Sequence, residues 1–328
     1  MKNAYYVTSF RKLTISDLIT GHVELLPGVN ITNDARIRRR LLTPEFAKAA
    51  GSIEMDFLQR APTVVFGEFD ADEMQGLTPE KFLLCIIIWI DGLFRNAWLI
   101  KDHAMECDAA FLRVAHSGGS VWSSNFLAMR PSFADGDFLR NVEMSMPELK
   151  AWGIKNELVD SYLVNMQSTS LRFMLEKGYA RSGRAMQFIA SARKTADVAF
   201  KLANYCSALE TLFTTEPTEL AHKLSERVAF FLGERGYNRR EVFASVKGAY
   251  GVRSKLVHGD TLKPKQIEDL PSLSMRCDDY LRSILNAIFE SADLKRVFDT
   301  REGAIEDYFA QLIFGAFTSP TDIEAEHE

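Results

Sequence analysis

Apolar and polar residues alternate in short segments through the first 150 residues of the chain. This alternation has the two-residue period of β-strands, and the Gly118-Gly119 pair marks a hairpin turn between two of them. Two helices are expected among the strands, a short one at 44–50 and a longer one at 78–101, where Thr78 is a suitable N-cap followed by a proline. The segments expected to form strands are 4–10, 22–26, 63–69, 109–115 and 121–129.

The pattern changes after about Pro147, where apolar residues begin to recur with the 3.6-residue period of helices. We therefore expect an α+β domain over residues 1–150, an all-α helical bundle over 151–295, and a short helix with an acidic tail over 296–328. The chain as a whole should be predominantly helical. The helices expected in the second half cover 156–177, 184–213, 218–234, 239–257, 266–291 and 303–314.

The composition is that of a folded protein, with 47% apolar and 11% aromatic residues. The longest apolar run, Phe82–Ile90, stops at Asp91 and is much shorter than the roughly 20 residues that cross a bilayer. We expect this run to be a buried helix, and we expect no membrane association. The N-terminal segment lacks the apolar stretch of a signal peptide, which favours a cytoplasmic protein.

No metal or cofactor is expected, because a structural metal site needs ligands at short, paired spacings. The cysteines are far apart and form no Cys-x-x-Cys or Cys/His group; they are Cys85, Cys107, Cys206 and Cys277. The histidines of the first half are equally scattered, and we expect them at the surface or half-buried; they are His22, His103 and His116.

Charge is distributed unevenly along the chain. The formal net charge of −5 excludes a uniformly basic nucleic-acid binder. Between Leu171 and Lys265, however, 17 Lys and Arg residues stand against 9 Asp and Glu residues, a balance of +8. A basic helical region inside an acidic protein favours an anionic partner for that region. Solvated helix faces would give the same balance, and on charge alone this alternative is slightly favoured.

An arginine interrupts the apolar stripe of the helix expected at 239–257. The inward positions of that helix hold Val242, Val246, Ala249, Arg253 and Leu256. A guanidinium keeps its proton, so in a core it needs a paired anion and in a cleft it can bind one. His258 follows five residues later, directly before Gly259, a residue that commonly ends helices.

An arginine near a histidine suits phosphodiester chemistry without a metal. The arginine can stabilise charge on the phosphorane oxygens, and the histidine can transfer a proton near neutral pH. The alternative is structural: Arg253 could pair with Glu210 or Glu226 in a buried network, and His258 could cap its helix. The two residues alone favour the structural interpretation, because an arginine followed by a histidine at this spacing is common by chance.

Three segments around these residues occur in a recognisable order. The first, ALETL, is 208–212; the second, LSERVA, is 224–229 and is followed by Leu232-Gly233; the third, YGVRSKLVHG, is 250–259. In this order and spacing the segments resemble the HEPN domain, in particular its Apea-like branch. The resemblance covers roughly the C-terminal half of the chain and is sharpest across these fifty residues.

The resemblance implies an all-α bundle with an RX4–6H motif, in a family rich in metal-independent ribonucleases. It implies that Arg253 and His258 are catalytic, that Ser254 is the polar residue after the arginine, and that Glu210 is an acidic residue orienting one of them. Basic residues of the same domain would then bind RNA; we name Lys255, Arg227 and Lys247.

The function expected from the resemblance is a metal-independent endoribonuclease, in a toxin or phage-defence setting. RNA would be the substrate, and a homodimer through the HEPN helices would be the active unit. A protein antitoxin or regulator is a further possible partner. Some HEPN domains have lost nuclease activity, so the alternative is a non-catalytic module that binds RNA or a partner protein. The sequence indicates no function for residues 1–150.

Overall fold

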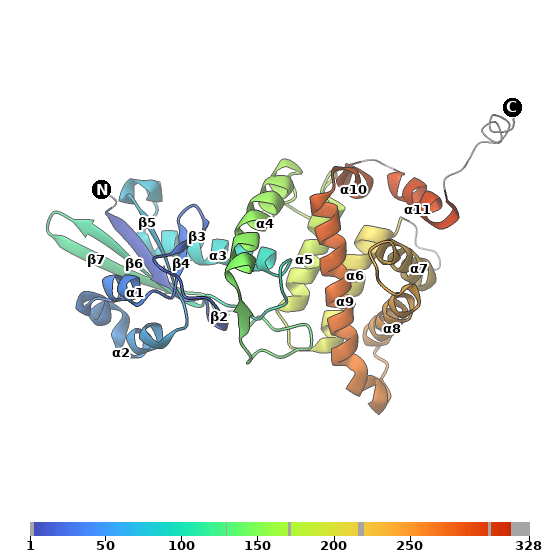
Figure 1. Ribbon diagram of the computed structural model, residues 1–328, viewed down its shortest axis with the longest axis horizontal. Helices are drawn as coiled ribbons and strands as arrows, with labels where there is room; N and C mark the ends of the chain where they lie inside the picture. The colour runs from blue at the N-terminus through green and yellow to red at the C-terminus, as the bar shows by residue number, and fades with distance from the viewer. Residues whose placement is uncertain (1–2, 129, 170–171, 216–219, 301–302, 316–328) are drawn as a thin grey trace. The chain divides into compact units, whose positions relative to one another are not determined.

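In the computed structural model the chain divides into two units, Met1–Phe133 with Asp137–Ser161, and Ala134–Gly136 with Tyr162–Glu328. The structure describes residues 3–315, apart from 129, 170–171, 216–219 and 301–302 (Figure 1). The expected domain boundary at residue 150 lies inside the first unit. The acidic tail expected at the C-terminus lies outside the described residues.

The fold is α+β with a helical majority, as the sequence predicts. The first unit contains β1 (Ala4–Thr8), β2 (Leu13–Ile15), β3 (Val23–Leu26), β4 (Val29–Thr32), α1 (Ala35–Leu41), α2 (Pro44–Arg60), β5 (Val64–Phe69), η1 (Ala71–Met74), α3 (Pro79–Ala97), β6 (Ala109–His116), β7 (Gly119–Phe126), β8 (Val142–Met144) and most of α4 (Met146–Asn165). The second contains α5 (Arg181–Arg193), α6 (Val198–Phe213), α7 (Leu220–Gly233), α8 (Arg239–His258), α9 (Pro264–Glu290), α10 (Ala292–Lys295), η2 (Arg296–Thr300) and α11 (Ala304–Phe314).

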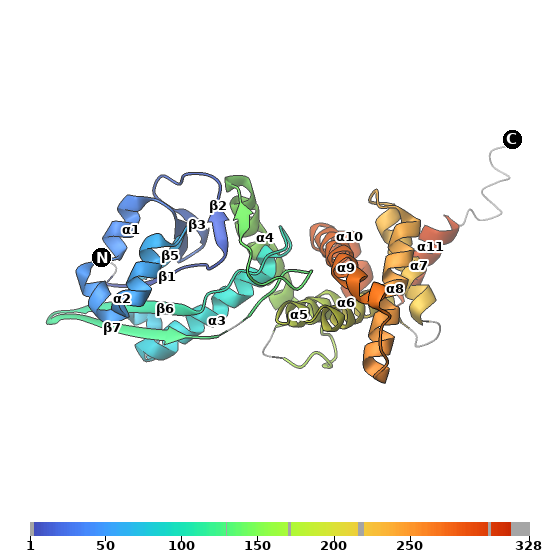
Figure 2. The ribbon, with the colours of Figure 1, turned by 90° about the horizontal axis from the view of Figure 1, so that it is seen from below.

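A six-stranded antiparallel sheet organises the first unit, in the order β3-β4-β5-β1-β6-β7 (Figures 1 and 2). Successive side chains of a strand point to opposite faces. Val7 of β1 packs in a core with α1 and α2, whereas Tyr6 packs in a second core with α3. The sheet is therefore covered by helices on both faces. A separate parallel pair joins β2 to β8.

Most elements expected in this unit are confirmed. All five expected strand segments contain a strand, and the two-residue turn 117–118 joins β6 to β7. Thr78 caps α3 by accepting from the Lys81 amide at 3.4 Å. The helix expected at 44–50 is longer in the structure, because α2 continues to Arg60 across a kink at Gly51, whose φ is 83°.

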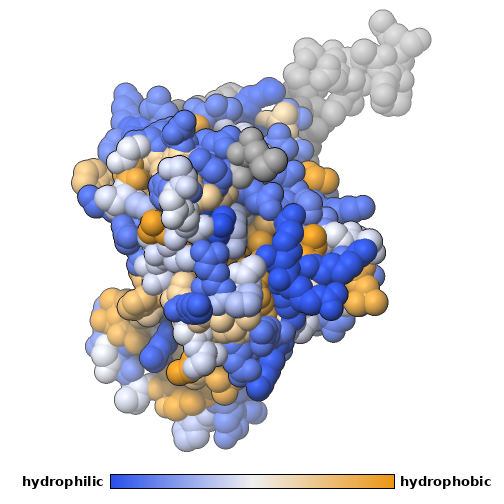
Figure 3. Space-filling model, turned by 90° about the vertical axis from the view of Figure 1, so that its left-hand side faces the viewer, coloured by the Kyte–Doolittle hydropathy of each residue, from blue (hydrophilic) through white to orange (hydrophobic). Residues whose placement is uncertain are grey.

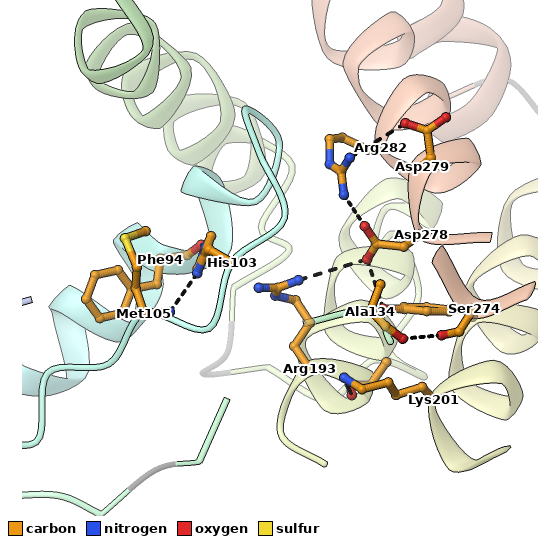
Figure 4. Close-up of polar contacts among 12 residues, drawn as sticks. Phe94, His103, Met105, Ala134, Arg193, Lys201, Ser274, Asp278, Asp279 and Arg282 are labelled. Atoms are coloured by element: carbon orange, nitrogen blue, oxygen red, sulfur yellow. Dashed lines mark hydrogen bonds and ion pairs between the residues drawn. The ribbon is translucent and has the colours of Figure 1, made fainter. Parts of the chain in front are cut away.

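His103, expected at the surface or half-buried, is buried in the loop after α3. Its Nδ1 accepts from the Met105 amide at 3.1 Å, and its Nε2 lies 2.9 Å from the Phe94 carbonyl (Figure 4). An imidazole that accepts at Nδ1 and donates at Nε2 is neutral. The residue therefore fixes the loop between the end of α3 and β6.

Two helix boundaries expected in the second half are wrong. The helix expected at 156–177 is α4, which starts ten residues earlier and ends at Asn165. Its start is a capping box, in which Glu148 Oε2 accepts from the Ser145 amide at 2.8 Å. The helix expected at 184–213 is two helices, because Asp197 accepts from the Phe200 amide at 2.8 Å and caps α6 separately from α5.

Helix α6 lies at the centre of the second unit and contacts α5, α7, α8 and α9. A buried polar cluster joins it to α9. The Tyr205 hydroxyl donates to Asp278 Oδ1 at 2.9 Å. Arg282 pairs with the same carboxylate (Figure 4). Lys201, also buried, donates to the Ala192 carbonyl at 3.0 Å. These buried charges have partners, so removal of a partner would leave a charge less well paired inside the packed helices.

Three residues of the loop before β8 belong to the second unit. The buried Ser274 hydroxyl of α9 donates to the Ala134 carbonyl at 2.6 Å (Figure 4). Gly136 has a φ of 89°, and a Cβ there would lie 2.6 Å from the Ala196 carbonyl oxygen. Only glycine permits so close an approach in this backbone conformation.

Within the residues described, no helix combines the length and the apolar character needed to cross a membrane. On the face drawn in Figure 3, apolar side chains form separate patches between hydrophilic ones.

Candidate active site

Helix α8 carries most of the residues expected in the site, and its ends are fixed as the sequence predicts. Asn238 accepts from the amides of Arg240 and Glu241 at 3.0 and 3.3 Å. At the other end Gly259 adopts the left-handed conformation, with φ 75° and ψ 18°. The helix therefore runs without interruption from Arg239 to His258.

The apolar stripe of α8 leaves the core one turn earlier than expected. Val242, Val246 and Ala249 are buried, and the stripe ends with the buried Val252. Leu256, expected to continue it, is exposed. Arg253 therefore lies where α8 passes from the core to the surface, with 31% of its side chain exposed.

Arg253 contacts two polar side chains. Its Nη2 lies 3.7 Å from Oε2 of Glu210 on α6. Its Nη1 donates to the Tyr250 hydroxyl at 3.4 Å, and the guanidinium carbon lies 5.3 Å from the centre of the Tyr250 ring. Both polar contacts are long, since strong charged hydrogen bonds measure about 2.7–2.9 Å. The guanidinium is therefore positioned by these groups and only loosely bound to them.

Burial raises the pKa of Glu210, while Arg253 and a hydrogen bond from Tyr250 lower it in part. Its Oε1 is buried and has no hydrogen-bond partner among the described residues. One turn earlier on α6, Cys206 is fully buried, and burial raises the pKa of its thiol. Cys206 is thus unreactive, whereas the Glu210 carboxylate depends on Arg253 and Tyr250 for its charge.

Tyr250 is the residue of this cluster to which no role was assigned from the sequence. Its hydroxyl accepts from Arg253 and donates to Glu210, and burial raises its pKa. Residues three apart lie on the same side of a helix, so the spacing of Tyr250 and Arg253 was the available signal. Glu210, Tyr250 and Arg253 are the three residues that the structure brings together; we call them the arginine cluster.

His258 does not join the arginine cluster within one chain. It is the last residue of α8 and is exposed, and within the described part of the chain it makes no hydrogen bond or ion pair. Five helical residues turn the chain by roughly 140°, which separates the imidazole from the guanidinium. Ser254, beside Arg253, is half-buried.

The three expected RNA-binding residues differ in their surroundings. Lys247 is exposed, with its Nζ 5.7 Å from the centre of the Phe243 ring. The Nζ of Lys255 donates to the Thr261 carbonyl and to Gln266 Oε1, both at 3.4 Å. These contacts leave both ammonium groups near solvent.

The expected RNA contact of Arg227 requires correction. Arg227 is only 3% exposed, its Nη1 donates to the Phe213 carbonyl at 2.7 Å, and its Nη2 pairs with Glu306 of α11. The guanidinium also lies 5.1 Å from the Phe309 ring. Arg227 therefore joins α6, α7 and α11 and is buried away from a phosphate in solution.

The described residues contain no group of three or more His, Cys, Asp or Glu side chains placed to hold a metal ion. Comparison with known proteins gives no assignment, because no protein-family model, no curated protein and no solved structure matches this chain.

Proposed function

We propose that this protein is a metal-independent endoribonuclease of the HEPN type, with Arg253 and His258 as its catalytic residues. The contrast between two arginines of the second unit supports this best. Arg227 is buried and bonded at 2.7 Å, as a structural arginine should be. Arg253 is partly exposed, with contacts of 3.4 and 3.7 Å. A guanidinium held so loosely can exchange its carboxylate for a phosphate.

The proposed reaction is a transesterification. The ribose 2′-oxygen bonds to the adjacent phosphorus and the bond from phosphorus to the 5′-oxygen breaks, giving a 2′,3′-cyclic phosphate and a 5′-hydroxyl. His258 takes the proton of the 2′-hydroxyl or protonates the leaving oxygen. Arg253 stabilises the charge on the phosphorane, and Glu210 and Tyr250 orient the guanidinium.

The proposed active unit is a two-fold dimer through α8. The reaction has two proton transfers, one from the 2′-hydroxyl and one to the leaving oxygen, and each needs a side chain. Each chain supplies one motif histidine, which points away from its own Arg253. Apolar side chains surround this helix end: Val257 is 65% exposed, and Leu256 and Ile267 are also exposed. Burial of these side chains against a second copy would place two His258 and two Arg253 residues around one cleft.

The first unit would select the RNA or sense a trigger, and an antitoxin or regulator protein would restrain the enzyme. These roles rest on the resemblance to HEPN proteins of toxin and phage-defence systems, and they follow only if the nuclease activity is found.

The test is incubation of the purified full chain with mixed RNA in EDTA. We expect cleavage that leaves 2′,3′-cyclic phosphate ends, spares DNA, and disappears in His258→Ala and Arg253→Ala. His222→Ala is the matched control, because His222 lies on α7 with its ring against Phe243. Activity abolished by EDTA, equal cutting of DNA, or full activity of His258→Ala would contradict the proposal.

A mixing experiment tests the dimer. Heterodimers of wild type with an Arg253→Ala, His258→Ala double variant should lose most activity if the site combines both chains. Half activity in each mixed dimer, or an active monomer by light scattering, would show that each chain acts alone.

The second candidate is a non-catalytic module that binds RNA or a partner protein. The contact between Arg253 and Glu210 favours it, because it gives the arginine an anionic partner within the chain. In that case the protein binds RNA without cleaving it, and the measurable effect of Glu210→Gln is a loss of fold stability.

A further inference from the structure

The two edges of the six-stranded sheet are built differently. The edge strand β3 has four residues, an irregular register between Glu24 and Leu26, and a proline directly after it. Short length, charge, proline and bulges all protect an edge from further pairing. The other edge, β7, has eight residues, pairs with β6 in register along its whole length, and contains neither a charged residue nor a proline. Only the β3 edge is thus protected.

β7 is also unusually open for a strand. None of its eight residues is buried, and Val121 and Phe126 are 53% and 77% exposed. An edge strand presents alternate N–H and C=O groups to its free side. Trp122 packs against Phe46 and Tyr5, yet its Nε1 is buried and no acceptor for it lies among the described residues. An added strand would pair with the backbone N–H and C=O groups on the free side of β7.

A pocket of about 380 Å³ adjoins the C-terminal half of β7, on the face covered by α2. Its apolar lining includes Ala50, Phe111 and Phe126, and its polar lining includes Ser124. Phe111 lies directly opposite Ser124 in the sheet, so the pocket opens beside the edge. A side chain on a strand added to β7 would reach it. Peptides that extend sheets gain affinity from main-chain hydrogen bonds and specificity from such pockets.

Carboxylates flank this half of β7 on both faces. Glu54 and Asp108 line the pocket and share one counter-ion, Arg11, at 3.6 and 2.5 Å. On the opposite face, Glu80 Oε1 accepts from the Ser123 hydroxyl at 3.0 Å. Three carboxylates against one guanidinium favour a basic occupant.

We propose that β7 binds an extended segment of a partner protein as a seventh strand. The segment places a large apolar side chain in the pocket and carries Lys or Arg beside it. A second copy of this chain fits less well. A two-fold pairing centred at Ser123 would bring both Glu80 carboxylates to the same face beside the axis, and like charges across strands are destabilising. This site is independent of the arginine cluster and of any nuclease activity.

The test is selection from a phage library of random peptides of about 12 residues on the immobilised full chain. We expect enrichment of sequences with alternating apolar residues and at least one Lys or Arg. A synthetic copy of an enriched peptide should bind in fluorescence anisotropy. Methylation of every second backbone nitrogen should weaken its binding at least about tenfold, because each methyl group removes a strand hydrogen bond.

Two variants locate the binding. Val121→Lys adds a charge to the middle of β7 and should weaken binding at least about tenfold, since edge lysines block pairing. Leu18→Lys adds the same charge to an exposed leucine outside the sheet and should leave binding unchanged. Thermal melting shows whether Val121→Lys is folded; if it is not, the methylated peptide still decides. The proposal would be overturned if no selected peptide lost affinity for Val121→Lys, or if methylated peptides bound as tightly as unmethylated ones. So would a wild-type dimer that Val121→Lys dissociates, because it would show self-pairing.

Discussion

Replacement of Arg227 by leucine would separate a structural role of this arginine from a role in RNA binding. The leucine retains apolar bulk beside Phe309 and removes two polar contacts. One is the hydrogen bond at 2.7 Å to the Phe213 carbonyl, and the other is the ion pair with Glu306 of α11. These contacts join helices that are distant in the sequence, so their loss should weaken the packing of the second unit.

The magnitude follows from the burial of each contact. A hydrogen bond from a charged group contributes about 1.5–3 kcal/mol, and this one is buried. The Glu306 side chain is 42% exposed, so solvent screens its ion pair to about 0.5–1 kcal/mol. We therefore expect Arg227→Leu to reduce the free energy of unfolding by about 2–4 kcal/mol. Glu306→Gln should cost less than about 1 kcal/mol, because it removes only solvent-screened ion pairs, those with Arg227 and Lys223.

The assay is urea denaturation followed by circular dichroism, with RNA affinity measured on the same folded samples. Lys247→Leu is the matched control; Lys247 is exposed, so its loss should change stability by less than about 0.5 kcal/mol while weakening RNA binding. Arg227→Leu should instead lower stability and leave RNA binding unchanged. Stability within about 0.5 kcal/mol of wild type together with weaker RNA binding would refute this reasoning.

Three further predictions concern the arginine cluster and His258. Tyr250→Phe should lower cleavage while reducing stability by no more than about 1.5 kcal/mol, because it removes two weak hydrogen bonds of a half-buried hydroxyl, with Arg253 and with Glu210; unchanged cleavage in a kinetic assay would contradict this. Burial raises the pKa of Glu210, so wild type should lose stability relative to Glu210→Gln as the pH rises from about 4 to 7. Urea denaturation at several pH values measures this difference. If Arg253 stabilised the carboxylate instead, wild type would gain stability relative to Glu210→Gln over the same range. His258→Ala should abolish cleavage without changing the melting temperature, since the side chain is exposed, and a large drop in that temperature would indicate a structural role.

Local signals explain which features could be predicted from the sequence. α8 was predicted to within a residue because Asn238 and Gly259 cap it and its apolar residues keep a helical period. The start of α4 was also readable, because Ser145 and Glu148 form a capping box with a proline in the first turn, yet the helix was expected ten residues too late. The helical period could not show where the stripe leaves the core, so Leu256 was expected inside.

Partners that are distant in the sequence explain what could not be predicted. Arg227 is structural because α11 brings Glu306 to it, and no local pattern contains that contact. The position of Tyr250 near Arg253 was visible, but its link to Glu210 depends on the packing of α6 against α8.

The inclusion of Ala134–Gly136 in the second unit has a consequence for how this protein can be divided. The chain passes between the units three times, so no single cut separates them. A fragment starting at Tyr162 would leave the buried Ser274 hydroxyl without its acceptor and expose the surface that Gly136 covers. A fragment meant to contain the whole helical unit must therefore also carry residues 134–136, which a single cut at residue 161 removes.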